Sequence, residues 1–299
     1  MNAKTVVVVA GPTASGKTAL AIELAQYFGT EIISADARQC YRQMNIGTAK
    51  PTSVELEMVP HHLVGHKDVW ESYSAGQFAC EALKVLEHIF AKHSVAIVVG
   101  GSGLYLRALC RGIDEMPPVN EALRQHVNAL WQERGLAFLL KELQQYDPTY
   151  YHQVDKSNPA RVKRALEVIY ATGKPYSSFR KQEPFPRPFR SLWIGLHLPR
   201  QVLYQRIHQR VEHMMAQGLL KEVESLLPYR HYHPLKTVGY SELFSYLDGL
   251  ITLDQAVDLI KQHTRNYAKR QLTWFSREPI QWFAPDKVQD IFAYLEQKI

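Results

Sequence analysis

The sequence contains little that would place the protein in a membrane or cross-link it. No apolar run among its 299 residues is long enough to span a bilayer, and the apolar part of the N-terminal segment is too short for a signal peptide. The three cysteines, Cys40, Cys80 and Cys110, lie far apart, which argues against structural disulfides and against a zinc knuckle. We therefore expect a cytoplasmic protein that makes no membrane contact.

The histidines also lack the pattern of a zinc enzyme. His61, His62 and His66, and likewise His231 and His233, form no helical i, i+4 pair with a carboxylate between its members. Hydrophobic residues make up 46% of the chain and charged residues 21%, an ordinary globular balance. The length suits one large domain or two smaller ones.

The most informative segment is residues 11–18, GPTASGKT, which matches the phosphate-binding loop G-x-x-x-x-G-K-[ST]. An apolar run, Val6–Ala10, precedes it and a helical pattern, Thr18–Phe28, follows, which is the strand–loop–helix context that the motif needs. Backbone N–H groups of such a loop surround an anion, and the helix N-terminus adds its dipole. The residues expected to bind a diphosphate or nucleotide such as ATP are Gly11, Pro12, Thr13, Ala14, Ser15, Gly16, Lys17 and Thr18.

Two side chains of this loop carry specific expectations. Lys17 would place its ammonium group on the terminal phosphates, and Thr18 would offer its hydroxyl to Mg²⁺ as a metal ligand. The motif predicts a bound polyphosphate without specifying which one, or what is done to it.

The N-terminal part of the chain alternates strands and helices as a parallel α/β sheet does. Expected strands are Val6–Ala10, Glu31–Ser34, His61–Val64 and Val95–Val99, and expected helices are residues 74–92, with a Ser74/Gln77 capping box, and 102–109. After Pro117–Pro118 the pattern becomes helical, over 121–134, 136–145 and 159–172, until a strand returns at Leu192–Leu198. Glu183–Arg190 is too rich in proline for regular structure.

This order predicts an α/β fold with a P-loop NTPase-like parallel sheet. Residues 1–112 and 190–299 would form the core, with a mostly helical C-terminal part that includes a long helix capped by Thr252 and Gln255. Residues 113–189 would form a helical insertion.

The positive charge is concentrated in this insertion. The chain carries +6, whereas residues 156–190 alone hold nine basic and two acidic residues, a net +7. Such clustering is typical of a polyanion-binding surface, although a solvated face beside the proline-rich segment gives the same pattern. The basic residues are Lys156, Arg161, Lys163, Arg164, Lys174, Arg180, Lys181, Arg187 and Arg190.

The strand Val95–Val99 lacks the metal-binding acid of an ordinary P-loop NTPase, because it is followed by Gly100, Gly101 and Ser102. ATP hydrolysis is therefore not the favoured use of the loop. Asp36 instead follows the second strand, at the edge where ligands bind in open α/β sheets, and could serve there as a general base. A turn or helix-capping aspartate explains its position equally well.

The long helix ending at Phe275 combines an apolar stripe with a row of cations, Lys261, Arg265 and Lys269, next to it. Tyr267 and Trp274 are interleaved with this row. Contacts to a phosphate backbone explain this pattern, as do core aromatics flanked by solvated cations. The stripe comprises Val257, Ile260, Thr264, Ala268, Leu272 and Phe275.

Several segments together resemble the bacterial tRNA dimethylallyltransferase family. They span nearly the whole chain in the order of the family, and only the phosphate loop among them is generic. The segments are GPTASGKT (11–18), ISADARQCY (33–41), MNIGTAKP (44–51), PHHL (60–63), VGGSGLYLRAL (99–109), RVKRALEVIYATGKP (161–175), KTVGYSE (236–242) and TRNYAKRQLTWF (264–275). The chain departs from the common family pattern at Ala37, Ser241 and Ser276.

The resemblance implies transfer of the dimethylallyl group from dimethylallyl diphosphate to N6 of the adenosine directly 3′ of the anticodon in tRNA, with Mg²⁺ as cofactor. By analogy with the family, Asp36 takes the proton of the adenine amine, while Ser102, Arg124 and Lys17 complete the catalytic set. The anticodon stem-loop would contact Asp36, Ala37, Arg38, Gln39, Ala160, Arg161, Val162, Lys163, Arg164, Lys236, Thr237, Val238, Gly239, Tyr240, Lys269, Arg270 and Arg277. We expect a monomer.

Three alternatives stay open at this point. A prenyltransferase of free adenine nucleotides would share the loop but would not need the basic insertion. A small-molecule kinase of the P-loop class would turn over ATP. An RNA-binding switch without catalytic activity would bind a nucleotide and form no product.

Overall fold

The computed structural model describes residues 4–180 and 185–299, and it separates into two compact units. The core unit comprises residues up to Arg111 and from Pro186 onward, and the helical unit runs from Gly112 to Phe185. The sequence predicted limits of 113 and 189 for the insertion. Lys181 and Glu183 lie outside the described residues.

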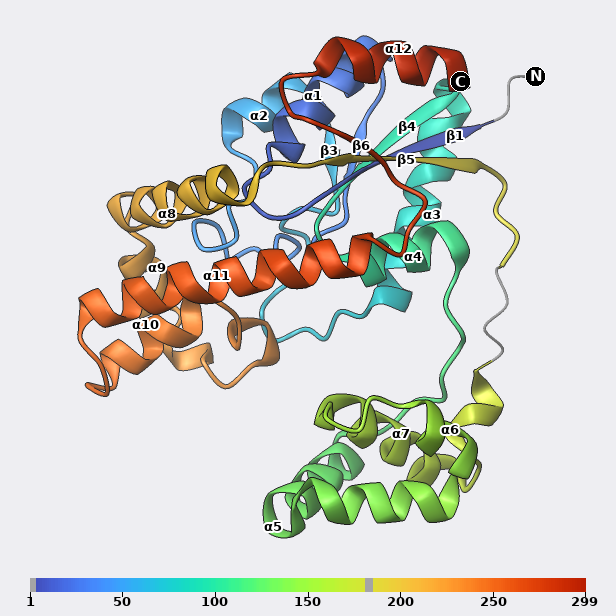
Figure 1. Ribbon diagram of the computed structural model, residues 1–299, viewed down its shortest axis with the longest axis vertical. Coiled ribbons are helices and arrows are strands. Elements are labelled where there is room, and N and C mark those ends of the chain that lie inside the picture. Colours follow the sequence, from blue (N-terminus) through green and yellow to red (C-terminus); the bar gives the residue numbers. More distant parts are fainter. Residues whose placement is uncertain (1–3, 181–184) are drawn as a thin grey trace. The chain divides into compact units, whose positions relative to one another are not determined.

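The core unit is built on a parallel sheet of six strands with the order β3-β2-β4-β1-β5-β6 (Figure 1). The strands are β1 (Thr5–Ala10), β2 (Ile32–Ser34), β3 (His61–His62), β4 (Val95–Val99), β5 (Arg190–Leu196) and β6 (Gln281–Phe283). β1 lies between β4 and β5, with Val7 opposite Ile97 and Leu192. The predicted parallel α/β fold is confirmed.

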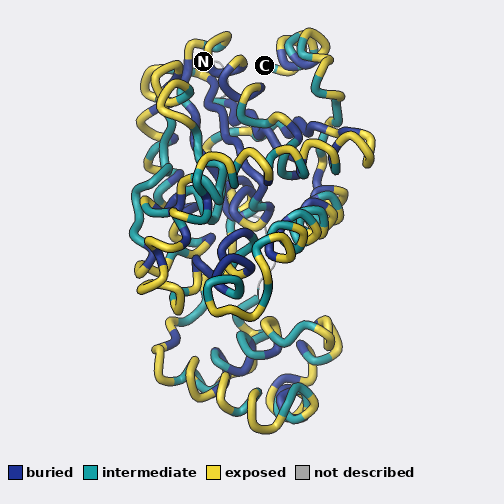
Figure 2. Tube along the Cα trace, turned by 90° about the vertical axis from the view of Figure 1, so that its left-hand side faces the viewer, coloured by how far each residue is buried: buried dark blue, intermediate teal, exposed yellow. Residues whose placement is uncertain are grey.

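Helices cover both faces of the sheet, which explains why β1 and β4 are continuous apolar runs, buried along their whole length. One face packs against α1 (Lys17–Tyr27) and α12 (Val288–Lys298). The other packs against α3 (Ala75–Lys92), α4 (Gly103–Arg111) and the end of α11 (Leu253–Phe275). Figure 2 shows the strands as a buried band beneath more exposed helices.

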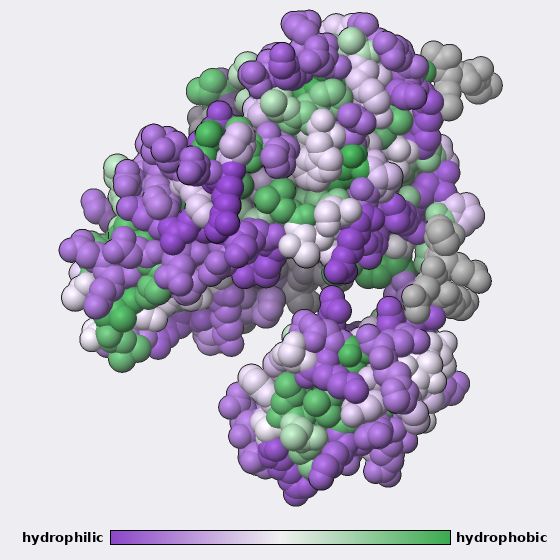
Figure 3. Space-filling view, viewed as in Figure 1, coloured by the Kyte–Doolittle hydropathy of each residue, from purple (hydrophilic) through white to green (hydrophobic). Residues whose placement is uncertain are grey.

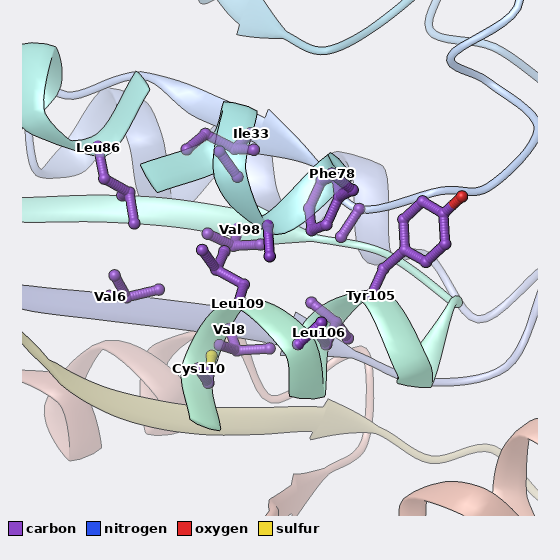
Figure 4. Packing of buried hydrophobic residues seen from close by; sticks show 14 of the residues in the cluster. Val6, Val8, Ile33, Phe78, Leu86, Val98, Tyr105, Leu106, Leu109 and Cys110 are labelled. Carbon is purple, nitrogen blue, oxygen red and sulfur yellow. The ribbon is translucent and has the colours of Figure 1, made fainter. Parts of the chain in front are cut away.

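The contact of α4 with the sheet shows how the second face is closed. Leu106 and Leu109 of α4 are fully buried and point toward Val8 and Val98 (Figure 4). Truncation of either leucine to alanine would cost about 2–5 kcal/mol, because a cavity would be left in a core that cannot collapse freely.

A separate apolar cluster joins the C-terminal helices to the loops that follow β2 and β3. It is formed by α8 (Arg200–Ala216), α9 (Leu219–Ser225), α10 (Tyr240–Leu247) and the first half of α11, together with Met44 and Val69. The sequence pattern did not resolve α8, α9, α10 and α12, nor the short helix α2 (Ser53–Met58) and strand β6. The capping boxes predicted at Ser74 and Thr252 are present.

The helical unit has its own core. It contains α5 (Glu121–Tyr146), α6 (Pro148–Gln153) and α7 (Pro159–Thr172), packed around Val127, Leu139 and Val162. The two helices expected over 121–134 and 136–145 meet at Gly135, whose φ of 73° interrupts the helical backbone. α7 begins at the predicted Asn158 cap and ends at Gly173, which adopts the left-handed conformation.

No helix among the described residues could cross a membrane, since none is both long and apolar enough. Most of the face in Figure 3 is hydrophilic, with the apolar residues in separate patches.

Candidate active site

The core unit contains a cavity of about 1230 Å³ at the carboxyl edge of the sheet, where open α/β folds bind their ligands. The phosphate loop follows β1, the segment 36–39 follows β2, and Gly100–Ser102 follows β4. The residues of the site thus lie directly after three neighbouring strands of the sheet. The cavity is also lined by residues 45–52, by α8 and α11, and by the segment 236–239.

The phosphate loop has the backbone that an anion cradle requires. Gly11, Ala14 and Gly16 have positive φ angles of 144°, 62° and 98°, and α1 begins directly after Gly16. A Cβ at Gly11 would lie 3.0 Å from the Leu196 carbonyl oxygen. The Ser15 side chain is buried in the loop, and its hydroxyl has no hydrogen-bond partner in this structure. The loop thus offers N–H and hydroxyl groups to an anion.

Lys17 is held inside this loop. Its Nζ donates to the Pro12 carbonyl oxygen at 2.6 Å. Burial and the positive charge of Arg210 lower the pKa of Lys17 to about 7, while Asp36 opposes that shift. A bound anion would give the Lys17 ammonium group a partner of opposite charge and would raise its pKa again.

Two arginines from α8 add positive charge beside the loop. The Arg210 guanidinium donates to the Thr13 hydroxyl at 3.1 Å, and burial lowers its pKa. Arg206 lines the same cavity, near Gly16. With Lys17, they form a cationic pocket that fits a polyphosphate.

Gln271 ties the phosphate loop to the end of β4. Its side-chain oxygen accepts from the Thr13 N–H at 2.8 Å, and its side-chain nitrogen donates to the Gly101 carbonyl oxygen at 3.0 Å. The side chain is buried in α11 and approaches Gly101 so closely that a Cβ there would clash with it. This amide therefore fixes the spacing between the loop and Ser102.

Asp36 lies in the cavity and also shapes its own turn. Its Oδ1 accepts from the N–H groups of Arg38 at 2.8 Å and Gln39 at 3.2 Å. Asp36 also acts electrostatically on Lys17 and on Arg210, which places its carboxylate near the phosphate pocket. Asp36 thus forms a turn and also lines the cavity, while its role as a general base stays a prediction.

Ser102 links the segment after β2 to α11. Its hydroxyl accepts from the Ala37 N–H at 3.0 Å, and Tyr267 hydrogen-bonds to it. Burial raises the pKa of Tyr267 to about 12. Asp36, Ser102 and the phenol of Tyr267 therefore belong to one polar group at the cavity wall.

The loop 45–47 is fixed by a carboxylate. Glu222 of α9 accepts from the N–H groups of Asn45, Ile46 and Gly47 at 3.0, 2.8 and 3.1 Å, and from the Tyr240 hydroxyl at 2.7 Å. A Cβ at Gly47 would lie 2.6 Å from the Tyr240 ring, so only glycine fits there.

Tyr240 itself is fully buried, with its hydroxyl hydrogen-bonded to Glu222, so its side chain does not line the cavity and is not available for the predicted contact with tRNA. Of the segment before it, Lys236, Thr237, Val238 and Gly239 line the cavity.

The three cations predicted to form a row on α11 do not form one surface. Lys261 pairs with Glu212 at 2.9 Å, and the Arg265 guanidinium contacts His208, so both hold α8 against α11 instead of forming an open ridge. Lys269 and Arg277 are exposed, while Arg270 lines the cavity. Of the predicted apolar stripe, Ile260, Ala268 and Phe275 are buried and the other three residues only partly so, whereas Gln271 is buried as well.

The charged cluster of residues 156–190 is not one surface, which corrects the sequence interpretation. Arg187 donates to the carbonyl oxygens of Ala108 and Leu109, and Arg190 donates to Thr5 and Ile299, so both stabilise the core unit. The remaining described cations of the stretch belong to the helical unit.

Within α7, Val162 is buried in the helical core, whereas Ala160 and Arg161 are exposed. Arg161 and Arg164 lie near Tyr176, since both oppose the rise in its pKa that burial causes. Lys163 instead lies over the Trp131 ring, 4.2 Å from its centroid.

Arg124 is an exposed residue of α5 in the helical unit and approaches Glu121 at 3.7 Å. Its catalytic role stays a prediction.

No group of three or more His, Cys, Asp or Glu side chains among residues 4–180 and 185–299 could hold a metal ion. Oxygen donors that suit Mg²⁺ in the cavity wall include the Thr18 hydroxyl at the start of α1 and the carboxylate of Asp36. This small set suits Mg²⁺, which is commonly held by one or two protein oxygens together with substrate phosphates.

The residues of the cavity that the sequence did not predict as site residues include Arg206, Arg210, Tyr267 and Gln271. The i, i+4 spacing of the two arginines in α8 was an available signal. The role of Gln271 depends on its hydrogen bond to Thr13, which is 258 residues away in the sequence, so no pattern of neighbouring residues indicates it.

Comparison with known proteins agrees with this geometry. The IPP transferase family matches residues 39–278. The tRNA dimethylallyltransferase 1 of Bacteroides thetaiotaomicron is 49% identical over 97% of this chain and 95% of its own length. The tRNA dimethylallyltransferase of Cytophaga hutchinsonii is 46% identical over 99% of this chain and 98% of its own.

Solved structures give the same result. The full-length tRNA isopentenylpyrophosphate transferase from Bacillus halodurans superposes with a TM-score of 0.73 at 35% identity, covering 99% of this chain and 96% of that one. A eukaryotic dimethylallyltransferase acting on tRNA gives a TM-score of 0.77 at 29% identity, over 91% of this chain and 70% of that one. This chain belongs to the IPP transferase family.

Proposed function

We propose that this protein transfers the dimethylallyl group of dimethylallyl diphosphate to N6 of the adenosine 3′-adjacent to the anticodon of tRNA. The observation that carries the proposal is that a cationic phosphate loop, Asp36 and Ser102 line the same cavity. The comparisons give no support to a kinase or to a prenyltransferase of free nucleotides. We also propose that the protein acts as a monomer in the cytoplasm, where its substrate tRNA is found.

The chemistry follows from the two sides of the cavity. The N6 lone pair attacks C1 of the dimethylallyl group, the bond from C1 to the diphosphate oxygen breaks, and its electron pair leaves with the diphosphate. Lys17, Arg210 and the loop N–H groups stabilise that developing charge. Asp36 accepts the proton that N6 loses.

Thr18 would hold Mg²⁺ in this arrangement, and the ion would neutralise charge on the leaving diphosphate. Ser102 would orient the reacting amine while Tyr267 and the Ala37 N–H fix its hydroxyl. The target base must leave the stack of the anticodon loop to reach this cavity, as in other enzymes that modify bases.

The reaction can be tested by incubating the protein with labelled dimethylallyl diphosphate and either tRNA or AMP. Label is expected in the tRNA and not in AMP. Prenylated AMP would favour the free-nucleotide enzyme, and phosphate transfer from ATP would favour a kinase.

Diphosphate affinity should fall as the pH rises above about 7. Burial and Arg210 lower the pKa of Lys17 to about 7, so the free protein loses this positive charge at higher pH. A bound diphosphate raises the pKa of Lys17 again, so that binding takes up a proton and the affinity decreases by up to about tenfold per pH unit.

Titration calorimetry between pH 7 and 9, in two buffers of different ionisation enthalpy, measures this proton uptake. An affinity that stays constant over the range would contradict the role of Lys17, and Lys17→Met should abolish the uptake.

We further propose that the helical unit binds the anticodon arm through the Arg161–Arg164 face of α7. Replacing both arginines with alanine should weaken tRNA binding and reduce the slope of log K against log salt by roughly two, because each lost phosphate contact removes about one released counterion. Lys163→Ala is the matched control, since Lys163 faces Trp131. If the dependence of tRNA affinity on salt were unchanged in the double variant, Arg161 and Arg164 would be solvated surface residues that do not contact tRNA.

A further inference from the structure

The core unit carries exposed aromatic side chains outside the cavity. Trp70 and Tyr229 are 48% and 36% exposed, and their ring centroids lie 5.5 Å apart at an interplanar angle of 38°. Tyr232, which is partly buried, continues the row, 6.5 Å from Tyr229. We call these three residues the aromatic platform. Exposed rings that adjoin one another on a surface commonly mark a binding site.

The platform is anchored in the core beneath it. Val69, next to Trp70, is fully buried, and its N–H donates to the Gln43 side chain at 3.2 Å. On the other side, Leu226 and Leu235 are buried in the same apolar cluster. The segment around Trp70 and the segment that carries Tyr229 and Tyr232 are therefore both anchored in the core. This anchoring lowers the entropic cost of binding to the rings.

The segment that carries the two tyrosines of the platform is basic, whereas Asp68 and Glu71 lie close to Trp70 in the sequence. Residues 227–236, LPYRHYHPLK, contain two aromatic residues, two histidines, one arginine and one lysine, and no acidic residue. Arg230 pairs with Asp248 at 2.6 Å, while Lys236 is exposed. Aromatic faces combined with cations are typical of sites for single-stranded nucleic acid.

The platform is continuous with the wall of the cavity. Lys236, four residues after Tyr232, lines the cavity together with Arg38. Burial lowers the pKa of His233, and the charges of Arg38 and Lys236 lower it further, so this histidine lies near both cavity residues. A chain of four residues spans about 14 Å at most, a distance that a short stretch of unpaired nucleotides can cover.

We propose that the aromatic platform stacks an unpaired base of the tRNA anticodon loop, one that neighbours the adenosine in the cavity. This inference rests on the proposed function, since it takes the anticodon loop as the polymer that enters the cavity. Stacking on Trp70 and Tyr229 would hold the loop open while the target base is turned out of it. Because every base has an aromatic face, this contact would supply affinity without strict sequence preference.

The first test compares Trp70→Ala and Tyr229→Ala with Trp70→Phe, which keeps a ring. Each alanine variant should raise the Kd for an anticodon stem-loop roughly 5- to 150-fold, and Trp70→Phe should restore most of the affinity. Affinity for dimethylallyl diphosphate should not change. Leu250→Ala is the matched control, because Leu250 is an apolar side chain, 73% exposed, outside the platform.

The second test uses stem-loops in which one loop nucleotide at a time lacks its base. One abasic position should weaken binding to the unaltered protein and have no further effect on Trp70→Ala, as a double-mutant cycle predicts for a stacked pair. Equal stem-loop affinity of the alanine variants and the unaltered protein would overturn the proposal. So would a change confined to oligomeric state in sedimentation, which would make the platform a contact between copies of the chain.

These outcomes are separable from the proposed reaction. Product formation by the unaltered protein tests the reaction, whereas stem-loop affinity tests the platform.

Discussion

Replacing Asp36 with asparagine is expected to lower turnover by roughly 10²–10⁴, the usual contribution of a general base. The asparagine oxygen can still accept from the N–H groups of Arg38 and Gln39, so the turn that Asp36 forms should be kept. The substitution therefore removes the base without removing the local structure. Single-turnover assays with saturating tRNA and dimethylallyl diphosphate measure the loss.

Two comparisons make this result interpretable. Asp36→Ala should lose at least as much activity, since it removes both the base and the turn acceptor. Asp290→Asn, at an exposed position of α12, should retain normal turnover. Near-normal turnover in Asp36→Asn would reduce Asp36 to a turn residue and would require another base.

The second large effect is expected at Lys17. Lys17→Ala should weaken dimethylallyl diphosphate binding by roughly 100-fold, because removing one partner of a buried, hydrogen-bonded charge pair typically costs 2–5 kcal/mol. Affinity for tRNA should change little, since Lys17 is held inside the phosphate loop by its bond to Pro12.

Separate equilibrium titrations with each substrate check this difference. Lys84→Ala, at an exposed position of α3, is the matched control. If both affinities fell equally in Lys17→Ala, the loop would not be a dedicated diphosphate pocket.

The parts of this structure that the sequence predicted are those with strong local signals. The apolar runs of β1 and β4, the phosphate loop, and the caps at Ser74, Asn158 and Thr252 each depend on a few adjacent residues, and the structure has all of them. The family resemblance rested on segments spread through the whole chain, and the comparisons confirm it.

The features that escaped prediction depend on distant contacts. Gln271 resembles an ordinary helical glutamine until the fold places it between Thr13 and Gly101. Arg187 and Arg190 counted toward a basic surface in the sequence, yet their hydrogen bonds belong to the core unit. Lys261 and Arg265 likewise pair with side chains of α8, which no spacing within α11 reveals.

The polar contacts around Asp36 illustrate both cases. Its position after a strand predicted its place at the edge of the sheet, while the chain of contacts from Ala37 through Ser102 to Tyr267 required the fold. The general rule of α/β sheets thus located the site, and the packing of α11 determined its details.

The most direct test of this account is to locate the transferred group. Unmodified tRNA is incubated with the protein and dimethylallyl diphosphate, digested with nucleases, and analysed by mass spectrometry. The account predicts one dimethylallyl group on N6 of the adenosine 3′-adjacent to the anticodon, formed without ATP and lost with Asp36→Asn. A product that forms only with ATP, or a prenyl group found on free nucleotide and never on tRNA, would contradict it.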